Sequence, residues 1–117
     1  MRPEENRLLD MLDYARRITR RLRGVERQEF DEDPDLKYAI TYFMQVIGEA
    51  ASHVTRETRD QHADVPWTQI VGMRQILVHG YFAVNLDRIW ATATVSVPEL
   101  IRVLEADLAD LERERNQ

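Results

Sequence analysis

Apolar residues recur at steps of three and four along most of the chain, and this spacing restricts the possible fold more than any other feature. Such steps place side chains on one face of an α-helix. Stripes of this kind run through residues 8–25, 36–54, 67–77, 86–93 and 100–111. No strand candidate is longer than residues 92–97, and there is no internal repeat or Gly-rich phosphate loop. The sequence therefore predicts an all-α bundle of four or five helices.

The breaks between the stripes predict where helices begin and end. We expect the acidic, proline-containing segment 29–34 to break the first helix, and the second to run over residues 35–59. After a loop at 60–65, Pro66 suits a first helical turn and Gly80 suits a helix end. The last boundaries rest on capping residues: Asn85 before the fourth helix, and Ser96 with Glu99 in the form of a capping box.

Length and composition set broad limits on the molecule. A chain of 117 residues is most simply one domain, here 1–117 with residues 110–117 as a fraying tail. The chain has no cysteine, a polar N-terminus and no apolar run of membrane-spanning length, so we expect a soluble, cytoplasmic protein. The net charge of −5 argues against non-specific DNA coating. Small residues at 48–52 would let another helix approach closely, and a dimer would add burial.

The octet 74–81 carries the chemistry: Arg74, then His79 five residues later, then Tyr81. A His can take a proton from a ribose 2′-hydroxyl or give one to a leaving 5′-oxygen. An Arg fork can bind a phosphate and stabilise charge on its oxygens. Together they suffice for metal-independent RNA cleavage, and DNA is excluded as a substrate because it lacks the 2′-hydroxyl. The three histidines are too scattered for a metal-ligand cluster, and no cofactor is indicated.

Spacing alone leaves a structural alternative open. Residues 74 and 79 lie roughly 140° apart on a regular helix, so they converge only if the helix ends at Gly80 or a second protomer supplies one of them. An Arg and a His near a helix end can also simply interact with the helix dipole. Of the other polar groups, His53 and His62 are expected to be solvated surface or loop residues. Two tryptophans, Trp67 and Trp90, are expected in the core rather than as base-stacking platforms.

The ordered motifs resemble the HepT-like family of HEPN-domain toxins. The octet fits the Arg-x4-His-x-Tyr pattern, and residues 46–51, 65–67 and 81–90 are similar to that family in order and spacing. The resemblance implies a HEPN-like helical bundle, a homodimer with a composite cleft, and endoribonuclease activity. It also implies a cognate nucleotidyltransferase antitoxin as partner, which would add AMP to the motif tyrosine.

Carried over residue by residue, the resemblance makes Arg74 and His79 catalytic and Tyr81 the site of AMPylation. Glu49 would support the site by orienting Arg74 or capping a neighbouring helix. Gln75 departs from the pattern, because the family usually has a small polar residue after the Arg, often Asn. A non-catalytic HEPN dimer that serves a nucleotidyltransferase as a binding or scaffold subunit therefore remains the alternative.

A cluster of arginines could track RNA or form a solvated helix face: Arg16, Arg17, Arg20, Arg21, Arg23 and Arg27.

Overall fold

The computed structural model describes residues 3–75 and 82–116, apart from the side chains of residue 3 and of residues 82–85. Every regular element within this part of the chain is helical, which confirms the all-α class. The elements are α1 (Pro3–Leu22), α2 (Arg27–Glu32), α3 (Pro34–Ser52), α4 (Arg56–Gln61), α5 (Trp67–Val71), α7 (Phe82–Ala91), the π-helical η1 (Thr92–Ser96) and α8 (Val97–Arg115). They exceed the four or five expected because α2 occupies part of a predicted break and because the predicted helix 35–59 is divided into α3 and α4.

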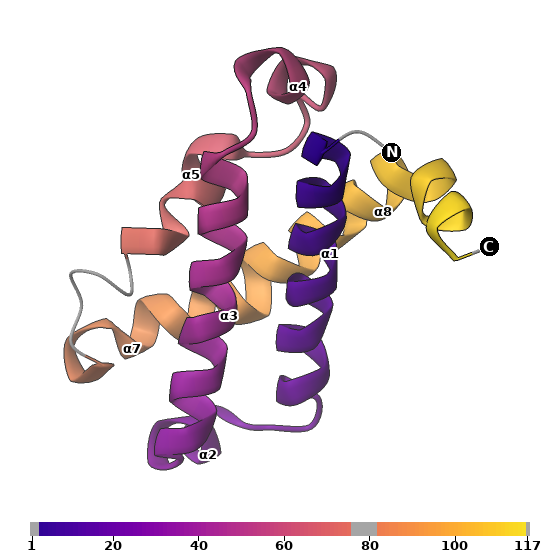
Figure 1. Cartoon of the computed structure of the whole chain (residues 1–117). Helices are drawn as coiled ribbons and strands as arrows, with labels where there is room; N and C mark the ends of the chain where they lie inside the picture. Colours follow the sequence, from indigo (N-terminus) through magenta and orange to yellow (C-terminus); the bar gives the residue numbers. More distant parts are fainter. Residues whose placement is uncertain (1–2, 76–81, 117) are drawn as a thin grey trace.

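The long helices form two layers. Figure 1 shows α1 and α3 side by side and antiparallel, with α8 crossing behind them and α7 beside α3 at the left. The molecule measures 41 × 28 × 19 Å, and its shortest dimension corresponds to two helices of about 10 Å each. Within the described residues, none of the helices combines the length and apolar character that crossing a bilayer requires.

The core lies between these layers and is built from the predicted stripes. Fully buried members include Leu8 and Ile18 of α1, Ile40 of α3, and Leu100 and Leu108 of α8. Burying each such side chain contributes roughly 1.5–3 kcal/mol relative to exposure. The stripes therefore explain why these helices pack face to face.

Both tryptophans pack against this core, as expected. The Trp67 ring is partly buried, and its Nε1 donates to the carbonyls of Arg59 and His62 at 3.2 and 3.1 Å. The Trp90 ring lies 5.2 Å from the buried ring of Phe30. Each indole therefore anchors a short element, α4 or α2, to the bundle.

The first predicted helix ends earlier than we expected. The backbone reverses at Gly24, whose φ of +74° is the left-handed conformation that glycine adopts without strain. A new helix, α2, then occupies part of the segment expected to be a break. The Asp33 side chain caps α3 by accepting from the Leu36 N–H at 3.1 Å, and Pro34 fills the first turn. The 16–27 arginines therefore do not share one helix, since Arg27 belongs to α2.

The second predicted helix is likewise divided. It ends at Ser52, and α4 follows after a short turn. The Glu4 carboxylate accepts hydrogen bonds from the Thr55 and Thr58 hydroxyls, both at 2.8 Å, at the start of α4. These contacts tie the new helix to α1, which explains why the chain does not continue straight through residue 59.

Two capping predictions were wrong. Asn85 lies inside α7, which begins at Phe82, and the Ser96 side chain makes no capping hydrogen bond. The strand candidate 92–97 is instead a π-helical turn between α7 and α8. Pro98 accounts for this turn, because it has no N–H to give the carbonyl four residues back and its ring crowds that carbonyl.

Beyond residue 110, where we expected fraying, α8 continues to Arg115. In this last part of α8, Glu112 accepts a hydrogen bond from the Arg16 guanidinium of α1 at 2.7 Å.

Candidate active site

Arg74 lies at a close crossing between α3 and the chain that follows α5. Residues 73–75 form a helical turn just beyond α5. A Cβ at Gly48 would lie 2.7 Å from Arg74 Cγ, 2.8 Å from the Arg74 backbone nitrogen and 3.3 Å from the Ile70 carbonyl oxygen. Only glycine fits such distances without movement. The small-residue patch therefore packs against a segment of the same chain. Gly48 determines the position along α3 at which Arg74 contacts this helix.

Glu49, the next residue, contacts Arg74 and His53. Its Oε2 lies 3.0 Å from Arg74 Nε, and its Oε1 lies 3.1 Å from His53 Nε2. The Arg74 side chain is 44% exposed, so a phosphate arriving from solvent can reach the guanidinium. An Arg bound at one nitrogen by a carboxylate has a restricted direction while its planar fork keeps its donors. This contact is the one expected of a residue that orients Arg74.

His53 is the group whose contacts the sequence interpretation missed. It is exposed, as expected, but it shares the Glu49 carboxylate with Arg74. Its spacing of four residues from Glu49 on one helix would have indicated the pair.

Gln75 is exposed beside Arg74, and its backbone N–H donates to the Gly72 carbonyl at 3.0 Å. The remaining motif residues, His79, Gly80 and Tyr81, lie outside the described residues.

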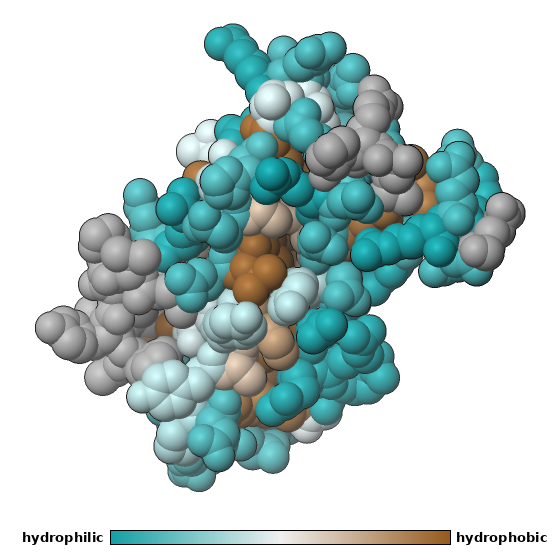
Figure 2. Space-filling model, viewed as in Figure 1, coloured by the Kyte–Doolittle hydropathy of each residue, from teal (hydrophilic) through white to brown (hydrophobic). Residues whose placement is uncertain are grey.

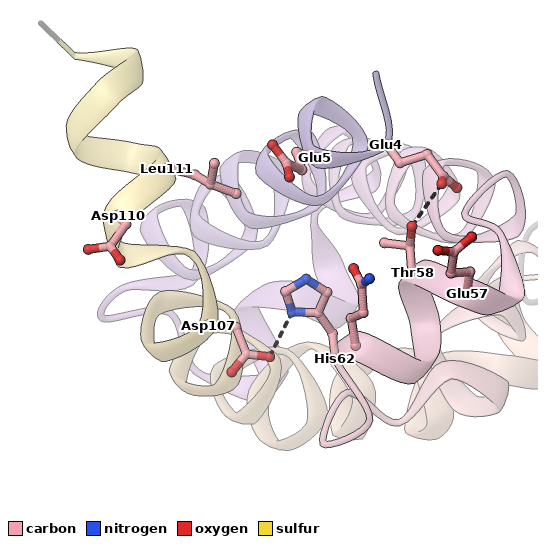
Figure 3. A pocket seen from close by; sticks show the side chains of 9 residues that line it. Glu4, Glu5, Glu57, Thr58, His62, Asp107, Asp110 and Leu111 are labelled. Atoms are coloured by element: carbon pink, nitrogen blue, oxygen red, sulfur yellow. Dashed lines mark hydrogen bonds and ion pairs between the residues drawn. The ribbon is translucent and has the colours of Figure 1, made fainter. Parts of the chain in front are cut away.

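A hollow of about 560 Å³, which Arg74 does not line, lies between the start of α1, α4 and α8. In Figure 3, His62 and Asp107 point toward one another across it, and Glu4 reaches Thr58 at its rim. Four carboxylates beside Asp107 also line it, which disfavours a polyanionic ligand such as RNA: Glu4, Glu5, Glu57 and Asp110.

His62 lies in the turn after α4, which agrees with the loop position expected as an alternative, but it is not a solvated residue. Its side chain is only 17% exposed, and its Nδ1 lies 3.2 Å from Asp107 Oδ2. Burial and a hydrogen bond with Asp64 raise the pKa of Asp107, and the His62 contact opposes them. Within the described part of the chain, no group of three His, Cys, Asp or Glu side chains is placed to hold a metal ion.

Comparison with known proteins assigns the chain to a family. Residues 11–106 match the family described as Ribonuclease HepT-like. This match covers most of the chain and includes both Glu49 and the whole 74–81 octet. The chain therefore belongs to the HepT-like ribonuclease family.

Curated relatives carry ribonuclease names. A "Putative RNase" of Methanocaldococcus jannaschii is 32% identical over 105 residues, which cover 90% of this chain and 87% of the relative. Another of that name, from Caldanaerobacter subterraneus subsp. tengcongensis, is 40% identical over 83 residues, covering 71% and 74%. "Probable ribonuclease HepT" of Thermococcus cleftensis is 26% identical over 99 residues, covering 85% and 90%. No solved structure matches the chain.

Proposed function

We propose that the protein is a metal-independent endoribonuclease toxin that cleaves RNA with Arg74 and His79. The observation that carries the proposal is the Glu49–Arg74 ion pair at 3.0 Å, in a chain of the HepT-like ribonuclease family. An oriented, solvent-reachable guanidinium and a histidine five residues further along the chain supply the charge stabilisation and the proton transfer that phosphodiester cleavage can use. RNA is the substrate class that this chemistry and the relatives' names support.

The reaction uses the substrate's own nucleophile. His79 accepts the proton of a ribose 2′-hydroxyl as its oxygen attacks the adjacent phosphorus. The P–O5′ bond breaks, and the leaving 5′-oxygen receives a proton from a second His79 or from water. The products are a 2′,3′-cyclic phosphate and a 5′-hydroxyl. Arg74 binds the phosphate and stabilises the charge that develops on its oxygens.

A homodimer would supply the second His79, and we include it in the proposal. Each 13.8 kDa protomer contributes one octet, so two copies facing each other hold the acid and the base in one cleft. Analytical ultracentrifugation at micromolar concentration should show a species of twice the protomer mass.

Regulation completes the proposed function. A cognate nucleotidyltransferase antitoxin transfers AMP from ATP to the Tyr81 hydroxyl: the phenol oxygen bonds to the α-phosphorus, loses its proton, and pyrophosphate leaves. The adduct places a phosphate near Arg74, where it competes with RNA phosphate for the guanidinium and repels the incoming backbone.

Purified protein incubated with RNA and a chelator tests the catalytic proposal. Arg74→Ala and His79→Ala should each lower the cleavage rate on the order of a hundredfold or more. Arg102→Ala is the matched control, since it removes an exposed, ion-paired Arg from α8. Cleavage that requires added metal, or that survives His79→Ala unchanged, would refute the mechanism.

The alternative function is a non-catalytic HEPN dimer that acts as the scaffold subunit of a nucleotidyltransferase. The observation that favours it is Gln75, which stands exposed beside Arg74 where the family usually has a smaller polar residue. A protein that binds its nucleotidyltransferase partner tightly, yet cuts no RNA under any condition, would select this alternative.

A further inference from the structure

A groove between α1 and α3 opens on the side of the molecule away from α8. Its larger part has a volume of about 600 Å³, and a smaller hollow of about 240 Å³ lies further along α1, beside Phe43. Figure 2 shows this face as a narrow apolar strip between hydrophilic borders. The larger part is lined by Arg7, Asp10, Tyr14, Tyr42, Gln45, Val46, Glu49, Ala50 and His53, and the smaller by Arg17, Arg20, Arg21 and Phe43.

Unneutralised positive charge gathers at one end of this groove. Arg16 is bound by Glu105 and Glu112, and Arg27 by Asp31 and Asp87, so neither is available to a ligand. By contrast, Arg20 and Arg21 are exposed and form no ion pair with any residue in the described ranges 3–75 and 82–116. These two arginines therefore give the smaller hollow the charge that complements phosphate.

Aromatic rings line the groove next to these arginines, and one of them is exposed. Tyr42 is 56% exposed, and its ring lies 6.1 Å from that of Phe43. On α1, the half-buried Tyr14 ring lies 5.8 Å from that of Phe43, and the Arg17 guanidinium lies 4.5 Å over the Tyr14 ring. Rings exposed beside guanidinium groups are the elements with which proteins bind single-stranded nucleic acid, by stacking bases and neutralising the backbone.

The opposite end of the groove reaches the candidate active site. Glu49 lines the groove and is also the residue that contacts Arg74. From Arg7 to Arg21 the groove runs about 21 Å along α1, at a rise of 1.5 Å per residue. At about 3.4 Å per stacked nucleotide, this length accommodates roughly six nucleotides.

We propose that the α1–α3 groove binds single-stranded RNA and guides it to Arg74. Arg20 and Arg21 hold backbone phosphates, and Tyr42 stacks a base. This inference rests on the proposed function for the identity of its ligand. It divides the 16–27 arginine cluster by role: Arg16 and Arg27 hold helices together, whereas Arg20 and Arg21 meet RNA.

Binding must be measured separately from cleavage. A fluorescently labelled, unstructured RNA of about twelve nucleotides, fully 2′-O-methylated, cannot be cut by a mechanism that needs the 2′-hydroxyl. Fluorescence anisotropy with this probe at several salt concentrations compares the wild-type chain with three variants: Tyr42→Ala, Tyr42→Phe, and the double variant Arg20→Gln/Arg21→Gln. Arg102→Gln/Arg113→Gln is the matched control, because it removes two exposed Arg charges from α8.

We expect the Arg20/Arg21 double variant to weaken binding on the order of tenfold and to reduce the salt slope by about one to two. Tyr42→Ala should weaken binding on the order of tenfold, while Tyr42→Phe keeps the stacking ring and binds like the wild type. The α8 control should bind within about twofold of the wild type. Circular dichroism melting should be unchanged for all four variants, since the altered side chains are exposed.

Equal affinity of all variants would overturn the groove proposal. So would a shift in sedimentation of the Tyr42 variants with unchanged RNA affinity, because it would assign this face to a second copy of the chain. The two proposals fail separately. If the wild-type protein cleaves RNA but the groove variants bind the probe as tightly as the wild type, only the groove proposal is refuted. If the groove variants bind the probe more weakly but the wild-type protein cleaves no RNA, only the ribonuclease proposal is refuted.

Discussion

Glu49 of α3 and Arg74 beyond α5 form an ion pair at 3.0 Å, although they are far apart in the sequence. The contact exists because α3 has glycine at position 48, which lets the Arg74 backbone lie directly against the helix. Orientation of the proposed phosphate-binding group thus depends on a glycine and a carboxylate that are adjacent in the chain.

Glu49→Gln tests whether the carboxylate positions Arg74. The amide keeps the size of the side chain but loses the charge that fixes the guanidinium, so RNA cleavage should fall on the order of tenfold. Thermal stability should hardly change, because this pair is largely solvated. In an Arg74→Ala background the same substitution should have no further effect on the rate. Glu57→Gln, an exposed Glu of α4, serves as control. A full loss in both backgrounds would mean that Glu49 acts without Arg74.

Gly48→Ala tests the close crossing. The added methyl would meet Arg74 Cγ at 2.7 Å and its backbone nitrogen at 2.8 Å, so the two segments must separate. We expect a loss of about 1–3 kcal/mol in the free energy of unfolding and a lower cleavage rate. Gly72→Ala adds the same methyl away from Arg74 and should cost less. Melting temperatures by calorimetry provide the comparison, and equal values for the two variants would contradict the crossing's role.

Gln75→Asn tests the departure from the family pattern. Asn restores the shorter amide, so cleavage should rise or stay equal if Gln75 orients phosphate or His79 less well. Initial rates on one RNA substrate give the answer. A large drop would show instead that the site is built around the longer side chain.

Tyr81→Phe tests the proposed modification. Co-expression with the cognate nucleotidyltransferase should add one or more AMP units to the wild-type chain and silence it, and intact-mass spectrometry would detect them. The Phe variant has no hydroxyl to modify, so it should fold normally and escape inhibition. Full neutralisation with no change in mass, or an adduct on another residue, would point to steric occlusion.

Acid should weaken the junction of α1 and α8. The hydrogen bond from Arg16 lowers the pKa of Glu112 below its ordinary value of 4.5. A carboxylate whose pKa is lowered by folding stabilises the folded state above pH 4.5. This contribution to the free energy of unfolding disappears as the pH falls through the lowered pKa. Arg16→Gln should therefore reduce stability by about 1 kcal/mol at pH 7 and by less near pH 3. Denaturant titrations at both pH values measure this, with Arg20→Gln as a control; a constant difference would exclude the linkage.

The sequence predicted the helical class and most of the buried face because apolar periodicity is a local property. Leu8, Ile40 and Leu100 could be placed in the core from spacing alone. Helix ends were less predictable, because they depend on contacts between distant segments. The bonds from Thr55 and Thr58 to Glu4 are an example, since nothing near residue 55 indicates that α1 supplies the acceptor.

The candidate site was predictable in part. The motif identified Arg74, and the resemblance to HepT-like proteins suggested that Glu49 supports it. The geometry of the Glu49–Arg74 pair could not be inferred, since it depends on how the chain beyond α5 crosses α3. The contact of His53 with Glu49 could have been inferred from their spacing of four residues on one helix. The catalytic roles of Arg74 and His79 and the modification of Tyr81 stay predictions.

The π-helical turn at Thr92–Ser96 determines the helical phase between α7 and α8. A π turn contains more residues than an α turn, so each helix meets the core at an azimuth that an uninterrupted α-helix would not provide. Removing one residue there would rotate α7 by about 100° relative to α8 and shift it by about 1.5 Å. Since α7 begins at Phe82, immediately after Tyr81 in the sequence, an insertion or deletion near Pro98 would displace the helix that follows the motif.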